Sequence, residues 1–207
     1  MPAAPWQGGS GVRQRQYRSY ETYLEHQASK LSMRPSTAEA FDSALREALS
    51  GRLALEDWTG MRVLCLAARL GGEVAAFRDQ GAFAVGVDLN PGADNPFVLW
   101  GDFHDLQFPD GSVDAVFTNS LDHAFDVGRL SREVRRVLRP GGTFLVDAAD
   151  FSASGPGLWE ATTWDTPDDL AELIEAEGFS RRSVDRITSP WPGTTTRFEA
   201  VTSVESK

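Results

Sequence analysis

The middle of the chain alternates between short apolar runs and segments whose apolar residues recur at helical spacing. The runs have the length and composition of buried strands, and they occupy residues 61–66, 82–87, 97–100, 113–118 and 143–146. Two segments between them, 73–80 and 126–138, have the pattern of amphipathic helices. Strands that alternate with helices predict a mainly parallel sheet with helices on both faces.

The residues before this region predict a tail and two helices. Residues 1–16 are rich in small and polar side chains, and we expect them to form a flexible tail. Aromatic and apolar side chains then recur at helical spacing until Pro35 breaks the pattern. A second helix is expected from Ser36, which forms a capping box with Glu39. Residues 17–52 therefore predict an N-terminal helical lid.

The chain after residue 150 predicts an irregular segment, a helix and a hairpin. Residues 151–164 combine Gly and Pro with two Trp side chains, which is typical of an insertion anchored by aromatic residues. In residues 165–207, Thr166 caps a helix, and a Pro-Gly turn separates two β-rich segments. The two strands of this hairpin are expected at residues 182–188 and 196–204. Residues 17–207 are expected to form a single domain.

Composition and charge narrow the class of partners. The 207 residues are enough for one domain with a full core, and the net charge of −10 argues against a nucleic-acid partner. Cys65 is the single cysteine, so no internal disulfide is expected. No apolar run reaches the roughly 18 residues that span a membrane, and residues 1–11 lack a signal-peptide pattern. We expect a cytoplasmic protein that binds neither nucleic acid nor membrane; its oligomeric state does not follow from these features.

Polar and small residues follow the ends of the predicted strands. The strand at 61–66 enters a turn of small residues at 67–72, and the next strand ends on Asp88. Later strands are followed by Asp102, Asn119 and Asp147. Right-handed crossovers bring these strand ends to one edge of the sheet, where ligands bind. A turn at a helix N-terminus beside a carboxylate that accepts ribose hydroxyls predicts a site for a nucleoside-containing cofactor.

Ordered motifs between residues 61 and 150 are similar to those of a known family. They are the strand and turn at 63–71, the acid within 85–89, the Gly-Asp segment at 101–111, the strand at 113–116, the Asp122-His123 pair and the turn at 138–142. In this order and spacing the chain resembles the class I S-adenosylmethionine-dependent methyltransferases, in particular their small-molecule branch. The resemblance implies a Rossmann-like α/β fold, doubly wound, with a mainly parallel seven-stranded sheet and a C-terminal antiparallel hairpin. It also implies S-adenosyl-L-methionine as the cofactor.

The resemblance further assigns roles to individual residues. Asp88 would bind the ribose and Asp102 the adenine, with Phe103 as a wall of the adenine pocket. The full set of implied cofactor-binding residues is Ala67, Gly71, Asp88, Leu89, Asp102, Phe103 and Asn119. His123 is the candidate general base, since a neutral imidazole can take a proton near pH 7, although a His that only orders its loop fits the same pattern. No cluster of His, Cys or carboxylates has metal-ligand spacing, so no metal is expected.

The acceptor of the methyl group is expected to be a small molecule. It would bind between the first helix, the loop after Asn119 and the aromatic segment 151–164. The acidic balance of the chain favours an uncharged or cationic acceptor. Tyr20, Gln27 and Lys30 could cover the site from the first helix, although any docked helix with one polar face has the same pattern. The sequence does not distinguish O-, N- and C-methylation.

The first turn departs from the family in two ways. Ala67, Ala68 and Arg69 stand where the family usually has two glycines and a small residue, and Cys65 replaces an acid. A Cβ atom in this turn either takes up room beside the methionine moiety or requires those residues to avoid positive φ. The sequence therefore leaves open the alternative that the chain has the same fold but binds a cofactor or small ligand without transferring a methyl group. A nicotinamide-dependent oxidoreductase is a further alternative, but the turn lacks the Gly-x-Gly-x-x-Gly pattern of that class.

Overall fold

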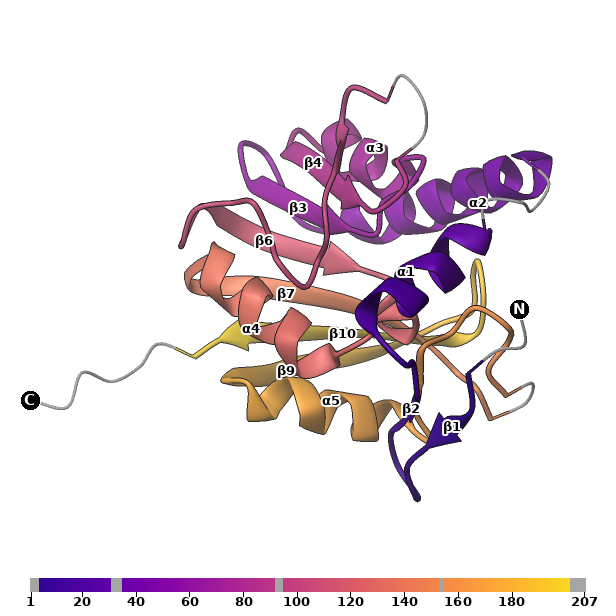
Figure 1. The fold of residues 1–207 in the computed structure, drawn as a ribbon. Helices are drawn as coiled ribbons and strands as arrows, with labels where there is room; N and C mark the ends of the chain where they lie inside the picture. The colour runs from indigo at the N-terminus through magenta and orange to yellow at the C-terminus, as the bar shows by residue number, and fades with distance from the viewer. Residues whose placement is uncertain (1–3, 31–34, 92–94, 153–154, 202–207) are drawn as a thin grey trace, which may run out of the picture.

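A seven-stranded sheet with helices on both faces forms the body of the protein (Figure 1). The computed structural model describes residues 4–30, 35–91, 95–152 and 155–201. Its helices are α1 (Tyr20–Ser29), α2 (Pro35–Leu53), α3 (Gly72–Asp79), the short 3-10 helix η2 (Leu121–His123), α4 (Val127–Val137) and α5 (Pro167–Ala176). Its strands are β1 (Trp6–Gln7), β2 (Arg13–Arg15), β3 (Arg62–Leu66), β4 (Phe83–Asp88), β5 (Val98–Trp100), β6 (Val113–Thr118), β7 (Leu138–Ala149), β8 (Thr162–Thr163), β9 (Phe179–Ile187) and β10 (Gly193–Ala200).

The topology of this sheet agrees with the prediction. The strand order is β5-β4-β3-β6-β7-β10-β9. Neighbours from β5 to β7 pair in parallel, whereas β10 is antiparallel to both β7 and β9. The predicted mainly parallel, seven-stranded sheet with a C-terminal antiparallel hairpin is therefore confirmed. Since the parallel strands share one direction, β3, β4 and β6 end at the same edge of the sheet.

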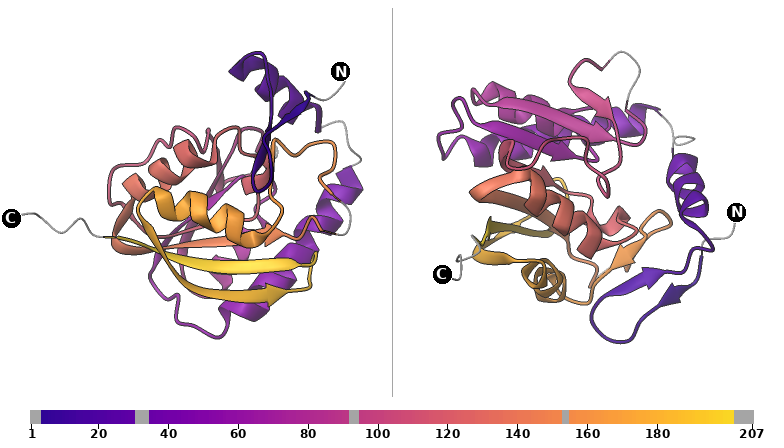
Figure 2. Two further views of the ribbon diagram at one scale, coloured as in Figure 1. Left: turned by 90° about the horizontal axis from the view of Figure 1, so that it is seen from below. Right: turned by 60° about the vertical axis from the view of Figure 1, so that its left-hand side comes forward.

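The alternating side chains of β3 fill two separate cores. Leu64 and Leu66 belong to the cluster that includes side chains of α4 and α5. Val63 and Cys65 belong to the cluster that includes side chains of α2 and α3. Figure 2 shows these two pairs of helices on opposite faces of the sheet. Burial on both faces explains why this strand reads as a continuous apolar run rather than an alternating one.

Residues 6–15 form an ordered hairpin, so the flexible tail predicted for residues 1–16 is wrong in this part. β1 pairs with β2, and β2 pairs with β8, which makes a second, three-stranded antiparallel sheet. The guanidinium of Arg15 donates to the carbonyl oxygens of Glu160 at 2.6 Å and Gly157 at 3.0 Å. These partners lie 145 and 142 residues away in the chain, so local composition could not indicate them.

The two N-terminal helices have different surroundings. α1, the lid helix, lies beside the loop that follows β6, where the hydroxyl of its buried Tyr23 donates to the carbonyl oxygen of His123. Figure 1 shows α1 at the front of the molecule, near the right-hand ends of the strands. α2 packs on α3, and its Leu49 and Leu53 belong to the core on that face of the sheet. The helical lid predicted for residues 17–52 is therefore wrong for α2, because helical periodicity does not show which surface a helix covers. The capping box predicted at Ser36 lies outside the described side chains.

The segment after β7 connects the large sheet to the small one. Its Trp164 is buried, packs against Phe151 with ring centroids 5.0 Å apart, and donates its indole N–H to the carbonyl oxygen of Ala149. The backbone N–H of Ala161 donates to the carbonyl oxygen of Asp122 at 2.7 Å. These contacts hold the segment against the loop that follows β6. Within the described part of the chain, no helix is long and apolar enough to cross a membrane.

An ion pair connects α2 to the sheet. Both terminal nitrogens of Arg52 donate to the carboxylate of Asp147 in β7, at 2.9 and 2.5 Å, and Asp147 is buried. The hydroxyl of Thr195 also donates to Asp147. This carboxylate is one of the strand-end acids that the sequence brings to the edge of the sheet, and its partners here are protein groups.

Replacing Arg52 is expected to destabilise the fold. Arg52→Met leaves the buried Asp147 carboxylate without its cationic partner, which should lower the free energy of unfolding by about 2 kcal/mol. The effect is less than for a fully buried pair, because the Arg52 side chain is 27% exposed. Denaturant-induced unfolding measures it. The control is Arg46→Met on the same helix, which removes the exposed pair with Asp79 and should change stability by about 0.5 kcal/mol or less. Equal losses in the two variants would contradict the anchoring role.

Candidate functional site

The loop between β3 and α3 turns sharply through left-handed backbone conformations. Ala67 has φ 56° and Arg69 has φ 33°, so of the two alternatives for a turn with Cβ atoms, avoidance of positive φ is not the one observed. Between them, Ala68 is buried against Gly86 of β4, where an added Cβ would come within 2.6 Å of the Ala68 methyl. Its backbone N–H donates to the carbonyl oxygen of Val87 at 3.1 Å. This packing holds the loop against β4 despite the conformational cost at Ala67 and Arg69.

Ala67→Gly is expected to stabilise the protein. Glycine adopts positive φ without a Cβ penalty, so the substitution should raise the free energy of unfolding by about 1 kcal/mol and leave ligand binding intact. Thermal and denaturant unfolding measure the change. The neighbouring Ala68→Gly is the control: Ala68 is outside the left-handed region, and loss of its buried methyl should lower stability by about 1 kcal/mol. A loss of stability in Ala67→Gly would contradict this description of the loop.

Asp88 ends β4 directly beside this loop. One carboxylate oxygen accepts the backbone N–H of Arg69 at 3.0 Å, and the other accepts that of Asn90 at 2.6 Å. Burial raises the pKa of Asp88 above its ordinary value, although the two N–H donors and the charges of Arg69 and Lys30 oppose this shift. Each carboxylate oxygen keeps a further lone pair. Asp88 can therefore accept hydrogen bonds from a ligand while two backbone donors fix its orientation.

His123 and Lys30 face the loop from the other side of the site. The Nδ1–H of His123 donates to the carbonyl oxygen of Trp159 at 3.1 Å, which fixes the neutral tautomer with its lone pair on Nε2. That lone pair accepts from Nζ of Lys30 at 2.8 Å. Tyr23 of α1 donates its hydroxyl to the carbonyl oxygen of His123 at 3.1 Å. The lid helix, the loop after β6 and the segment after β7 therefore meet at His123.

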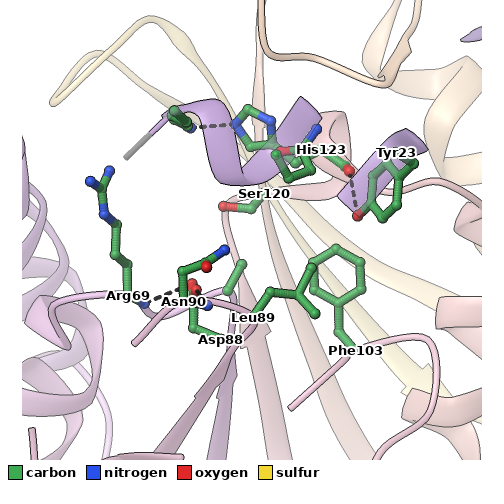
Figure 3. Close-up of a pocket in the computed structure, with 11 residues that line it drawn as sticks. Tyr23, Arg69, Asp88, Leu89, Asn90, Phe103, Ser120 and His123 are labelled. Atoms are coloured by element: carbon green, nitrogen blue, oxygen red, sulfur yellow. Dashed lines mark hydrogen bonds between the residues drawn. The ribbon is translucent and has the colours of Figure 1, made fainter. Parts of the chain in front are cut away.

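These groups surround one cavity of about 100 Å³ at the carboxyl ends of the strands (Figure 3). Its lining comprises Tyr23, Gln27, Lys30, Ala67, Arg69, Asp88, Leu89, Asn90, Phe103, Ser120 and His123. In Figure 3, Asp88 and His123 lie on opposite sides, with Ser120 between them. Four predicted cofactor-binding residues, Ala67, Asp88, Leu89 and Phe103, thus come together with the predicted base His123. Their roles remain predictions.

Asp102 lies outside this lining and is engaged by protein groups. One carboxylate oxygen accepts from the backbone N–H and from Nδ1 of His104, at 2.8 and 2.9 Å, and the other accepts the hydroxyl of Tyr20. Burial would raise the pKa of Asp102, but these hydrogen bonds outweigh it and lower the pKa. Nε2 of the buried His104 accepts the backbone N–H of Asp126 at 3.2 Å. The structure therefore joins Asp102 to the lid helix through Tyr20, and its predicted adenine contact remains a prediction.

Gly71 and Asn119 also lie outside the lining of the cavity. Gly71 has φ 89° and precedes α3, and an added Cβ would lie 3.2 Å from Cγ2 of Val98. The side-chain oxygen of Asn119 accepts the hydroxyl of Ser120 at 2.6 Å. Gly71 therefore shapes the loop, and Asn119 orients a residue that does line the cavity.

Arg69 and Ser120 line the cavity but are not among the predicted site residues. The sequence marks Arg69 only as a departure from the family turn, and Ser120 has no signal apart from its place after a strand. Among the described residues, no three His, Cys, Asp or Glu side chains gather as a metal-binding group. The charged side chains of the lining are the carboxylate Asp88 and the cations Lys30 and Arg69.

Comparison with known proteins relates this arrangement to a family. Residues 64–146 match the family model described as a methyltransferase domain. An uncharacterized methyltransferase of Mycobacterium tuberculosis is 31% identical over 164 residues, which are 70% of this chain and 60% of that protein. The chain spans smaller shares, 22% and 33%, of two other curated relatives.

Solved structures share the fold over most of the chain. The 1,6-didemethyltoxoflavin-N1-methyltransferase of Burkholderia thailandensis matches with a TM-score of 0.71 and 18% identity, covering 97% of this chain and all of that one. The [4+2]-cyclase SpnF matches with a TM-score of 0.61 and 18% identity, covering 76% of this chain and 81% of that one. Likeness at this level of identity establishes the fold and leaves the chemistry to the residues of the site.

Proposed function

Because the chain belongs to the class I S-adenosylmethionine-dependent methyltransferases, we propose that it transfers the sulfonium methyl group of S-adenosylmethionine to a small-molecule acceptor. The observation that carries the proposal is the cavity between Asp88 and His123, at the carboxyl ends of the parallel strands. Ligands of such sheets bind at this edge. Here one wall contains the carboxylate of Asp88, which two backbone N–H groups hold in place. A carboxylate in this position can accept hydrogen bonds from the hydroxyl groups of a ribose.

The residues of the first wall fit the cofactor. Asp88 has lone pairs left for two ribose hydroxyls after it accepts the N–H groups of Arg69 and Asn90. The left-handed turn at Ala67 and Arg69 brings backbone close to the cavity. Leu89 and Phe103 add apolar surface for a purine. When bound, S-adenosylmethionine supplies an electrophilic methyl group on a positively charged sulfur.

The second wall fits an acceptor. In its tautomer His123 has one nitrogen lone pair, on Nε2, and that lone pair accepts a hydrogen bond from Lys30 at the cavity. The lid helix covers this wall: Gln27 donates to the carbonyl oxygen of Trp159 at 2.9 Å, and His26 contacts that of Leu158 at 2.9 Å. A site closed by helix and loop excludes water and orients an acceptor for in-line displacement. The Burkholderia protein, which is named for a small heterocyclic substrate, supports a small molecule as the acceptor here.

The alternative function is binding of the cofactor or a small ligand without methyl transfer, and one observation favours it. Ala67 and Arg69 carry Cβ atoms at positive φ in the turn that the family usually builds with two glycines and a small residue. The fold also occurs in a [4+2]-cyclase. Methyl transfer and its absence differ in one measurable quantity, the appearance of S-adenosylhomocysteine.

The test is to incubate the protein with methyl-labelled S-adenosylmethionine and a small-molecule extract of its source organism. We expect one labelled product by mass spectrometry, formed together with S-adenosylhomocysteine. The control is Asp88→Ala, which should give far less of both when the cofactor concentration is near the dissociation constant of the unmodified protein. Saturable cofactor binding without any labelled product would favour the alternative, and absence of both would contradict the proposal.

A further inference from the structure

Lys30 brings a positive charge into the cavity without a carboxylate partner. Its Nζ lies 2.8 Å from Nε2 of His123. Across the described residues, none of the ion pairs within 4.0 Å includes Lys30, whereas most Arg side chains of the body are paired with carboxylates. Lys30 sits at the end of α1 and lines the cavity. A cation that faces a cavity beside a neutral imidazole is a recognition group for an anion.

Charges of both signs surround Lys30, although none of the carboxylates forms an ion pair with it within 4.0 Å among the described residues. Asp122 and Glu160 favour its charged form, as does Asp88 more weakly, and Arg69 opposes it. Burial is the largest influence and lowers the pKa of Lys30. A buried ammonium gains most from a ligand that brings a negative charge to it, because burial has already removed much of its water. Of the charged side chains that line the cavity, Lys30 and Arg69 are cations and Asp88 is a carboxylate. This lining favours a negatively charged group on the acceptor, whereas the acidic balance of the whole chain predicts an uncharged or cationic one.

Resting on the proposed function, we propose that Lys30 and His123 select an acceptor with an acidic hydroxyl group, of the phenol or enol class, and hold it as its oxyanion once the hydroxyl proton has left. Lys30 turns its Nζ–H from His123 to the acceptor oxygen, and Nε2 of His123 takes the hydroxyl proton. Asp122, whose carboxylate lies 4.0 Å from Nε2, stabilises the imidazolium that forms. The oxygen lone pair then forms the O–CH₃ bond as the S–CH₃ bond breaks and its electrons return to sulfur. The products are a neutral methyl ether and S-adenosylhomocysteine, and His123 returns its proton to solvent.

The same cation could instead hold the carboxylate of the cofactor's methionine part. Substitution of Lys30 distinguishes these two sources of negative charge, the acceptor and the cofactor, because it weakens binding of whichever one Lys30 contacts. If Lys30 serves the acceptor, its substitution leaves affinity for the cofactor unchanged. If it serves the cofactor, that affinity falls and the preference for an acidic hydroxyl does not depend on Lys30.

The test uses the full chain saturated with S-adenosylhomocysteine and 4-nitrophenol as the probe, whose phenolate absorbs visible light and whose phenol does not. Titration at several pH values gives the affinity for each form. We expect the phenolate to bind at least about tenfold more tightly than the phenol, as for one charge-assisted hydrogen bond. Nitrobenzene, which lacks the hydroxyl, is the matched control ligand and should bind no better than the phenol. Lys30→Met should abolish the preference, and Lys30→Arg should retain most of it.

Calorimetric titration of each variant with S-adenosylhomocysteine separates the possible failures. Lys30→Met should keep its affinity within about twofold of the unmodified protein. The inference is overturned if the complex binds the phenol in preference, if it binds neither form, or if Lys30→Met keeps the preference. It is also overturned if Lys30→Met loses cofactor affinity about tenfold, which would assign Lys30 to the cofactor. A protein that binds no S-adenosylhomocysteine at all would instead contradict the proposed function, and the calorimetry shows this before the probe is added.

Discussion

Asp88→Ala is expected to weaken binding of S-adenosylmethionine about a hundredfold. Asp88 is oriented by the N–H groups of Arg69 and Asn90, and it would accept two ribose hydroxyls. Hydrogen bonds to a charged group contribute about 1.5–3 kcal/mol each, so loss of two bonds corresponds to a hundredfold change or more. Isothermal titration calorimetry measures the dissociation constant. The control is Asp185→Ala, which removes an equal charge from an exposed position in β9, at the far edge of the sheet, and should leave affinity unchanged.

The loss in Asp88→Ala should come from the ligand and not from unfolding. Burial raises the pKa of Asp88, so the native state binds this proton more tightly than the unfolded chain does, and ionisation lowers stability as pH rises through that range. Removing the carboxyl removes this electrostatic cost but leaves the N–H groups of Arg69 and Asn90 without their acceptor, so thermal unfolding of the variant is measured beside the titration. The same shift predicts the pH dependence of binding: as pH falls, Asp88 is protonated earlier than an ordinary Asp, whose pKa is about 3.9, and affinity falls with it. Unchanged affinity in Asp88→Ala would refute the ribose assignment.

His123→Asn is expected to lower kcat about a hundredfold for an acceptor that loses a hydroxyl proton. General-base catalysis contributes about 10² to 10⁴ in rate, and Nε2 of His123, which carries the lone pair of its tautomer, faces the cavity beside Lys30. Asparagine retains a donor for the Trp159 carbonyl oxygen but has no basic nitrogen. The rate of S-adenosylhomocysteine formation measures kcat, and calorimetry should show unchanged cofactor affinity.

The control for His123 is His26, a histidine of α1. His26 contacts the carbonyl oxygen of Leu158 and the hydroxyl of Tyr17, so His26→Asn loosens the lid without removing the proposed base. We expect a loss of kcat below about tenfold in His26→Asn. Similar losses in the two variants would show that His123 acts by ordering the lid and its loop.

The fold follows from signals that are local in the sequence. Apolar runs such as residues 63–66 indicate strands that are buried on both faces. Between these runs, apolar residues at helical spacing indicate helices, and alternating strands and helices are what a parallel sheet requires. Asp88 could be predicted for the same reason, because the end of a parallel strand lies at the ligand edge of the sheet. The hairpin of residues 6–15 could not, since Arg15 is held by carbonyl groups that lie more than 140 residues away.

The site is only partly predictable because its second wall is built by distant contacts. Lys30 meets His123 across 93 residues of sequence, and Tyr20 meets Asp102 across 82. A helix with one polar face indicates neither partner. The left-handed backbone at Ala67 has a similar origin, since the absence of a side chain at Gly86 gives Ala68 the room that fixes the turn. Residue types near strand ends can thus be identified from the sequence, whereas their partners depend on how the lid and loops close over them.

A crystal structure of the complex with S-adenosylhomocysteine tests the central claim most directly. We expect the ligand in the cavity between Asp88 and His123, with both ribose hydroxyls within about 3.2 Å of the Asp88 carboxylate oxygens. The sulfur should face His123 and Lys30 across the space left for the acceptor. A ribose bound away from Asp88, or a ligand that occupies another part of the molecule, would contradict the assignment of this cavity as the methyl-transfer site.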